Sequence, residues 1–160
     1  MRRQLIYIIL AVFSLINFVL AVIVQVQKNA NEHFGLLGKC FTEGGGCATV
    51  QTSFYSHYFF GISNPYLGMV FFSVWAALFF MLSMPHPKLN DKITVFIGTS
   101  LAVGAVFSFW LLYLQFFVIH AICIYCVWVD IIMIVTTLTY FVISAKEYVK
   151  SLASLKTYFY

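Results

Sequence analysis

The sequence contains very little charge. Only 9% of its 160 residues are Asp, Glu, Lys or Arg, whereas 62% are hydrophobic. A soluble domain of this length could not cover so much apolar surface, which excludes that class of protein. The chain is therefore predicted to be an integral membrane protein.

The sequence also lacks features that would divide it or interrupt its apolar runs. It has no internal repeat, no low-complexity tract and only three prolines. The runs are continuous and lack the alternating pattern of membrane barrels, so they predict helices. Four runs are long enough to cross a bilayer, at residues 5–26, 66–84, 93–117 and 121–144. We expect an all-α fold with one four-helix domain over residues 1–160.

The first run lacks the features of a cleaved signal peptide. Arg2 and Arg3 give it a basic start, but this apolar run of 22 residues exceeds the core of about 7–15 residues that signal peptides have. No Ala-x-Ala cleavage site follows it. We expect this run to remain as the first span.

The basic side chains predict the orientation in the membrane. If the N-terminus is cytoplasmic, seven of the nine Lys and Arg residues lie on the inner side, and only Lys28 and Lys39 lie outside. Both termini are then cytoplasmic, and a long loop over residues 27–64 faces outward. The net charge of +4 follows from this distribution and gives no indication of nucleic-acid binding.

All four cysteines are predicted on the outer side, where disulfides can form. Cys123 and Cys126 form a Cys-x-x-Cys motif at the head of the fourth run. A helix amino terminus and this spacing favour a thiolate, and they let one sulfur attack a partner disulfide while the other resolves it. The alternative is two buried thiols that act as small apolar groups. A haem-attachment site is excluded because Val127, not His, follows the motif.

Cys40 and Cys47 form the second pair, in the outer loop, and enclose three consecutive glycines. A disulfide that closes this eight-residue ring would stabilise the fold by about 2.5 kcal/mol, a modest gain. Soft glycines would instead let Cys47 leave Cys40 and reach Cys123. We therefore predict a redox shuttle, and the alternative is a passive structural disulfide.

Residues 49–60 are predicted to form a short interfacial helix with Thr49 as its N-cap. Its aromatic face comprises Phe54, Tyr55, Tyr58 and Phe59. Such a helix would cover the outer end of the bundle, shield a pocket and hold Cys47 above Cys123. The alternative is an ordinary belt of aromatic residues at the membrane surface.

Asp130 is the only acidic residue in a predicted span, and it lies one helical turn after Cys126 on the same face. Carboxylates within membranes are candidates for function, here to take or relay a proton. The alternative is a neutral carboxyl that bonds neighbouring helices. His120 could steady the Cys123 thiolate or simply end a helix. A metal site of these residues would leave the loop cysteines unexplained.

The order of these motifs resembles the vitamin K epoxide reductase family over nearly the whole chain. The resemblance is carried by Cys40 and Cys47, by Ser53, by Phe-Gly-Ile-Ser-Asn-Pro-Tyr-Leu-Gly at residues 60–68, and by Cys123-Ile-Tyr-Cys126. It implies a thiol oxidoreductase that uses a quinone of the menaquinone, ubiquinone or vitamin K type. By position, Cys40 would exchange with a thioredoxin-like partner, Cys47 would pass electrons to Cys123, and Cys126 would meet the quinone.

The resemblance also implies residues that bind the quinone. Asn64 matches a residue that hydrogen-bonds a quinone carbonyl, and an amide can donate to that oxygen as negative charge develops there. Ser53 matches a polar residue near the reactive cysteines. Tyr55, from the predicted aromatic helix, and Asp130 complete the set of candidate quinone-binding residues.

The chain departs from the family pattern in three respects. Six residues separate the loop cysteines, where the animal enzymes have seven. Asp130 stands where those enzymes have a tyrosine that contacts the quinone, which puts epoxide reduction in doubt. Many bacterial members carry a fused thioredoxin-like domain that the 160 residues do not contain, so we expect a separate thiol partner.

We therefore expect a multi-pass membrane enzyme that relays electrons from a thioredoxin-like protein, through two cysteine pairs, to a quinone. Its activity would promote disulfide formation outside the cytoplasm. One alternative is a vitamin K epoxide or quinone reductase. A second alternative is a non-enzymatic membrane scaffold with two static disulfides.

Overall fold

The computed structural model describes residues 2–30, 46–57, 61–84 and 87–158, and these contain helices and no strands. The long helices are α1 (Arg2–Ala30), α3 (Asn64–Leu82), α4 (Pro87–Tyr113) and α5 (Ile124–Tyr158). A short helix, α2 (Gly46–Thr52), lies between α1 and α3 in the sequence. The predicted all-α bundle with a short helix in its first long loop is confirmed.

Four helical segments in the described part of the chain are long and apolar enough to cross a membrane, and the third continues from α4 into a π-helical turn at Leu114–Val118. The four segments are Gln4–Val26, Asn64–Leu82, Ile93–Val118 and Ile124–Ala145. They agree with the predicted spans to within three residues at each boundary. Helix α5 extends well beyond its segment, to Tyr158, because a helix can continue into the polar sequence beyond an apolar run.

Ser63 and Pro65 set the start of α3. Ser63 is the N-cap residue, and Pro65 lies in the first turn. Proline is tolerated there because backbone amides of the first turn have no hydrogen-bond acceptor within the helix. The Ser63 hydroxyl donates to Oε1 of Gln25 on α1 at 2.8 Å, which ties the two helices together. The helix therefore starts two residues before the predicted boundary, and Asn64 lies in its first turn.

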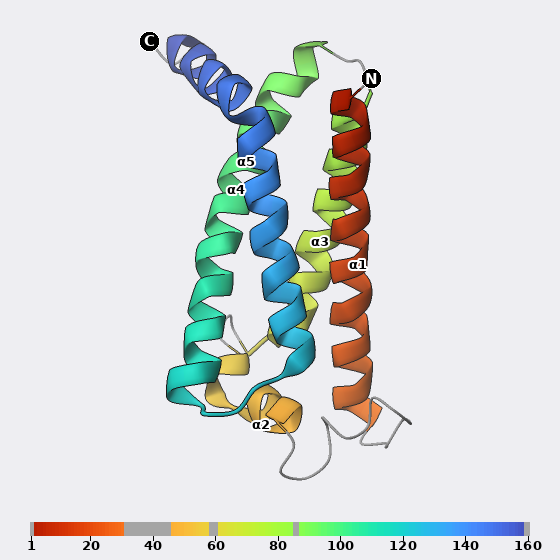
Figure 1. Cartoon of the computed structure of the whole chain (residues 1–160), viewed down its shortest axis with the longest axis vertical. Coiled ribbons are helices and arrows are strands. Elements are labelled where there is room, and N and C mark those ends of the chain that lie inside the picture. The colour runs from red at the N-terminus through yellow and green to blue at the C-terminus, as the bar shows by residue number, and fades with distance from the viewer. Residues whose placement is uncertain (1, 31–45, 58–60, 85–86, 159–160) are drawn as a thin grey trace.

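The two chain ends lie at one end of the bundle, and α2 lies at the other end beside the turn from α4 to α5 (Figure 1). Helix α1 packs mainly on α3 and also on α5, while α4 packs mainly on α5. Contacts between α3 and α4 are sparse. The half of the bundle near α2 therefore has room for a cavity between these helices.

The core lies where the four long helices meet. Its most completely buried large side chains are Leu10, Phe79, Ile97, Leu101 and Tyr140. The rings of Phe79 and Tyr140 lie 6.1 Å apart between centroids, so these side chains join α3 to α5. Apolar side chains on the outer faces remain exposed, as expected for surfaces that meet lipid.

Buried polar side chains also join the helices. The Tyr140 hydroxyl donates to the carbonyl of Thr94 at 2.7 Å, and Trp75 Nε1 donates to Ser100 Oγ at 2.9 Å. Such hydrogen bonds help to determine which helix faces pack together, because apolar side chains contact lipid as favourably as they contact another helix.

Replacement of Phe79 tests the position of the core. We expect Phe79→Ala to lower the free energy of unfolding by about 3 kcal/mol, because it leaves a cavity against Tyr140. The matched control is Phe80→Ala, whose side chain is 55% exposed and should have a much smaller effect. Chemical denaturation in detergent micelles would measure both, and equal losses would contradict the assigned helix faces.

Candidate functional site

The sulfur-bearing residues of α2 and α5 meet at one end of the bundle. Cys47, in α2, and Cys123, directly before α5, are both completely buried. They belong to one small apolar cluster with Val50, against which Ile119, Ala121, Tyr125 and Cys126 pack. Cys47 was predicted to reach Cys123, and the structure places the two residues in the same buried cluster.

The cysteines differ in bonding state. Cys47 takes part in a disulfide, whereas Cys123 and Cys126 are free thiols. Cys40 lies outside the described residues. The structure thus contains a disulfide-bonded cysteine in α2, and beside it a Cys-x-x-Cys motif whose two cysteines are thiols.

Gly46 permits the close approach of α2 to the segment before α5. A Cβ atom added at Gly46 would overlap the carbonyl oxygen of Ile122 and lie 3.0 Å from its carbonyl carbon. The neighbouring atoms are backbone and cannot rotate away, so any side chain here would push α2 outward. The three consecutive glycines were predicted to make the loop mobile. At Gly46 the structure adds a different requirement, which is contact between two backbones.

The prediction of one helix over residues 49–60 is wrong in its boundaries. Helix α2 spans Gly46–Thr52 and is followed by a 3₁₀ turn at Phe54–Ser56, so Thr49 is not an N-cap but lies within the helix. The Ser53 hydroxyl donates to the carbonyl of Val50, and the Ser56 hydroxyl donates to the carbonyl of Gln51, each at 2.7 Å. These local bonds compete with continued helix.

The predicted aromatic face is not formed as one surface in the described residues. Phe54 is 84% exposed, whereas Tyr55 is half-buried and lines a cavity. The two rings meet edge to face with centroids 6.0 Å apart. Tyr58 and Phe59 lie outside the described residues.

A cavity of about 460 Å³ lies beneath α2 and is lined by residues of all five helices. Most of the lining is apolar, and it includes Cys126. Its polar members come mainly from three places, namely α2 with the following turn, the start of α3, and the facing surfaces of α4 and α5. An apolar cavity with a few convergent polar groups is the usual form of a small-molecule site.

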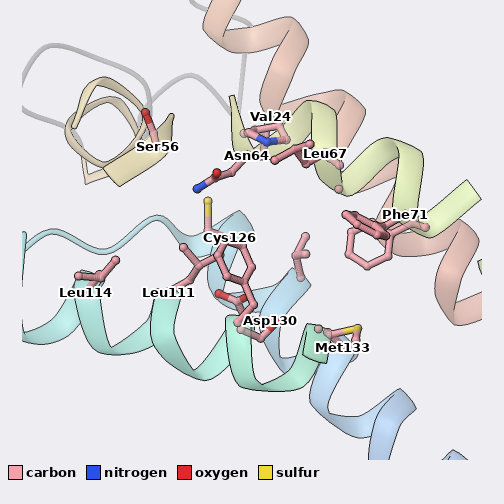
Figure 2. Close-up of a pocket in the computed structure, with 18 of the residues that line it drawn as sticks. Val24, Ser56, Asn64, Leu67, Phe71, Leu111, Leu114, Cys126, Asp130 and Met133 are labelled. Atoms are coloured by element: carbon pink, nitrogen blue, oxygen red, sulfur yellow. The ribbon is translucent and has the colours of Figure 1, made fainter. Parts of the chain in front are cut away.

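Cys126 stands at the end of the cavity nearest α2 (Figure 2). Its thiol donates a hydrogen bond to the sulfur of Cys123. Gln51 of α2 donates through Nε2 to Cys126 Sγ at 3.4 Å. Cys126 therefore connects the buried cysteine cluster to the cavity.

The hydrogen bond from Cys126 changes the acidity of Cys123, which directly precedes the membrane-spanning segment of α5. The bond lowers the pKa of Cys123 below its ordinary value, although burial acts in the opposite direction. A lowered pKa increases the thiolate fraction near neutral pH, and the thiolate is the form that attacks a disulfide.

The four residues predicted to bind a quinone all line this cavity, namely Ser53, Tyr55, Asn64 and Asp130. The side chain of Asn64 points toward Cys126 (Figure 2). Its Nδ2 donates to the backbone carbonyl of Tyr55 at 3.2 Å, while its buried Oδ1 has no partner among the described residues. Ser53 donates to the backbone and shapes the turn after α2.

Asp130 lies deeper in the cavity, one turn after Cys126 (Figure 2). Its side chain is only 3% exposed, and the Ser108 hydroxyl of α4 hydrogen-bonds its carboxyl group. The second oxygen, Oδ2, has no partner within the described part of the chain. One oxygen thus joins α5 to α4, and the other is available to a molecule in the cavity.

Two glutamines at the site were not predicted from the sequence. Gln51, 4% exposed, contacts Cys126, and Gln115, 3% exposed, accepts a hydrogen bond from the backbone amide of Cys123 at 3.0 Å. Gln115 lies in a π-helical turn, Leu114–Val118, and such turns are frequent at functional sites. A glutamine within an apolar run, such as Gln115, is a recognisable sequence signal for a functional residue. Gln51 has no such signal, because it lies in a polar loop.

His120 is exposed, adopts a left-handed backbone conformation with φ of 52°, and does not line the cavity. This geometry belongs to the turn between α4 and α5. Among the described residues, no group of three or more His, Cys, Asp or Glu side chains could hold a metal ion.

Comparison with known proteins gives one match. The model of the vitamin K epoxide reductase family matches residues 5–142, a range that contains all four cysteines, Asn64 and Asp130. No curated protein and no solved structure gives a significant match.

The contact at Gly46 can be tested by adding a methyl group. Alanine at most helix positions is more stabilising than glycine, but Gly46→Ala should displace α2 because of the overlap with Ile122. We expect hydrogen exchange over residues 46–52 and alkylation of buried Cys123 to accelerate about tenfold. Thr52→Ala, on the exposed side of α2, should leave both rates unchanged. Unaltered protection in Gly46→Ala would show that α2 is held in another way.

The acidity of Cys123 can be tested by removing its hydrogen-bond donor. Cys126→Ala should raise the pKa of Cys123, so the pH profile of Cys123 alkylation should shift to higher pH. Mass spectrometry of alkylated peptides would measure the profile, with Ile124→Ala, an exposed neighbour, as control. A shift to lower pH would contradict the stabilising role of this bond.

Proposed function

Because the chain belongs to the vitamin K epoxide reductase family, we propose that it is a quinone-dependent thiol–disulfide oxidoreductase that promotes disulfide formation outside the cytoplasm. Members of this family are membrane oxidoreductases that use quinones and thiol redox partners. One observation carries the specific proposal. Cys47 and Cys123 share a buried cluster, and Cys126, next to that cluster, lines the cavity.

Electrons enter through the loop cysteines. A dithiol of a separate thioredoxin-like protein reduces the Cys40–Cys47 disulfide and becomes oxidised itself. The Cys47 thiolate then attacks Cys123 in a Cys123–Cys126 disulfide, forms a Cys47–Cys123 bond and releases Cys126 as a thiolate. Cys40 attacks Cys47, restores the loop disulfide and releases Cys123. Each exchange breaks one S–S bond and forms another, so the electron pair ends on the Cys123–Cys126 dithiol.

The cavity is the proposed quinone site. Two electrons and two protons leave the Cys123 and Cys126 thiols, giving a Cys123–Cys126 disulfide and a hydroquinone. The described residues fit the apolar parts of this substrate and the hydroxyl groups of its reduced form. Apolar walls suit a ring and an isoprenoid chain. The hydroxyl groups of the product are suited by three buried cavity acceptors that have no partner among the described residues, namely Gln51 Oε1, Asn64 Oδ1 and Asp130 Oδ2.

Asp130 is proposed to exchange protons with the substrate. Its free oxygen lies at the cavity, and its bonded oxygen is oriented by Ser108. A carboxyl group can donate or accept a proton, whereas the tyrosine of the animal enzymes mainly donates a hydrogen bond. This difference supports reduction of a quinone by the chain rather than of an epoxide.

The proposed orientation places α2 and all four cysteines at the extracytoplasmic face. The distribution of basic residues supports cytoplasmic termini. The position of both chain ends opposite α2 is consistent with this orientation (Figure 1). The free thiols of Cys123 and Cys126 also favour an exchanging pair over a scaffold with two static disulfides.

Anaerobic mixing of the reduced protein with a quinone tests the assigned order. We expect a charge-transfer absorbance band between a thiolate and the quinone, because Cys126 lines the cavity. The band should disappear in Cys126→Ala and persist in Cys40→Ala. Its loss in Cys40→Ala alone would contradict the order of the two pairs. Turnover of vitamin K epoxide with a dithiol, assayed in parallel, would instead identify the protein as an epoxide reductase.

A further inference from the structure

The amide nitrogen of Gln51 has no role in the proposed relay, although the amide oxygen lies at the cavity. Gln51 lies in α2 four residues after Cys47, so the two side chains share one face of that helix. Both are buried, with Gln51 only 4% exposed. Helix α2 therefore presents a cysteine and a carboxamide together to the head of α5.

The side chain of Gln51 is directed at a reacting atom. Its Nε2 donates to Cys126 Sγ at 3.4 Å, and its buried Oε1 has no partner among the described residues. A buried amide oxygen without a partner lowers the stability of the fold, and an apolar side chain would avoid that cost. Packing therefore does not explain glutamine here, whereas a bond to Cys126 does.

Other polar groups near Cys126 are engaged differently. The Asn64 amide nitrogen bonds the backbone of Tyr55, and the thiol hydrogen of Cys126 is directed to Cys123. The carboxyl group of Asp130, one turn further along α5, is hydrogen-bonded by the Ser108 hydroxyl. Among the described residues, Gln51 is the side chain whose N–H group contacts this sulfur.

We propose that Gln51 is a catalytic hydrogen-bond donor that stabilises the Cys126 thiolate when Cys47 attacks Cys123. This inference rests on the proposed relay. In that step the Cys47–Cys123 bond forms, the Cys123–Cys126 bond breaks, and negative charge moves from the Cys47 sulfur to the Cys126 sulfur. A donor at the leaving sulfur favours the products, because thiolates that are better stabilised leave more readily.

The arrangement also links the attacking and leaving groups. The same seven-residue helix carries the nucleophile, Cys47, and the donor, Gln51. When α2 docks through Gly46, both reach α5 together.

The Cys40→Ser background isolates this step, because it removes the cysteine that would resolve the Cys47–Cys123 bond. After oxidation by one equivalent of quinone, the protein should distribute between a Cys123–Cys126 disulfide and a Cys47–Cys123 disulfide with free Cys126. Acid quenching, alkylation and mass spectrometry of the linked peptides would measure this ratio.

Gln51→Met keeps the length of the side chain and removes its donor. We expect Cys40→Ser/Gln51→Met to contain at least threefold less Cys47–Cys123 disulfide than Cys40→Ser, while its resistance to unfolding is equal or greater. Cys40→Ser/Thr52→Ala is the matched control. Thr52 lies on the same helix but is exposed, so its replacement should leave the ratio unchanged.

The outcomes separate this inference from the relay. An unchanged ratio in Cys40→Ser/Gln51→Met would overturn the role of Gln51 and leave the relay intact. If Cys40→Ser itself formed no Cys47–Cys123 disulfide, the relay and the inference would both be wrong. A lower ratio accompanied by lower stability would assign Gln51 a structural role and would likewise overturn the inference.

Discussion

The contact between the backbones of Gly46 and Ile122 is the constraint on which the site depends. A helix of seven residues is too short to be stable alone in water, so α2 exists because it is held against the bundle. The absence of a side chain at Gly46 allows that approach. Docking then buries Cys47 beside Cys123 and brings Gln51 to Cys126. One small residue thus positions both the sulfur that we propose attacks Cys123 and the amide that we propose stabilises the Cys126 thiolate.

The cavity beneath α2 combines two requirements that oppose each other. Stability of a membrane bundle is best served by apolar contacts and fully bonded polar groups. The cavity nevertheless contains buried acceptor atoms on Gln51, Asn64 and Asp130 that have no partner within the part of the chain that the structure describes. Each of these lowers stability until a donor arrives. Their cost is offset elsewhere, by the closely packed core around Phe79 and Tyr140 and by hydrogen bonds between helices. The part of the bundle near the cysteines is therefore suited to binding, and the opposite half is suited to stability.

Much of the fold and part of the site could be predicted because they depend on local patterns. The spans follow from apolar length, and the candidate cavity residues from motif positions, as Asn64 and Asp130 illustrate. The short helix was misplaced because serine side chains at Ser53 and Ser56 bond nearby carbonyls and divide the segment into a helix and a turn. Gln51 was missed because a glutamine in a polar loop has no distinguishing pattern, and its contact with α5 joins residues distant in sequence.

The sequence by itself determined that this is a membrane protein of four spans with two cysteine pairs, because hydrophobic length and cysteine spacing are properties of short stretches of chain. Only the tertiary structure decided which side chains meet at the head of α5. That outcome depends on how closely α2 approaches the bundle, and the approach is governed by steric overlap between backbone atoms of Gly46 and Ile122, which no local pattern records.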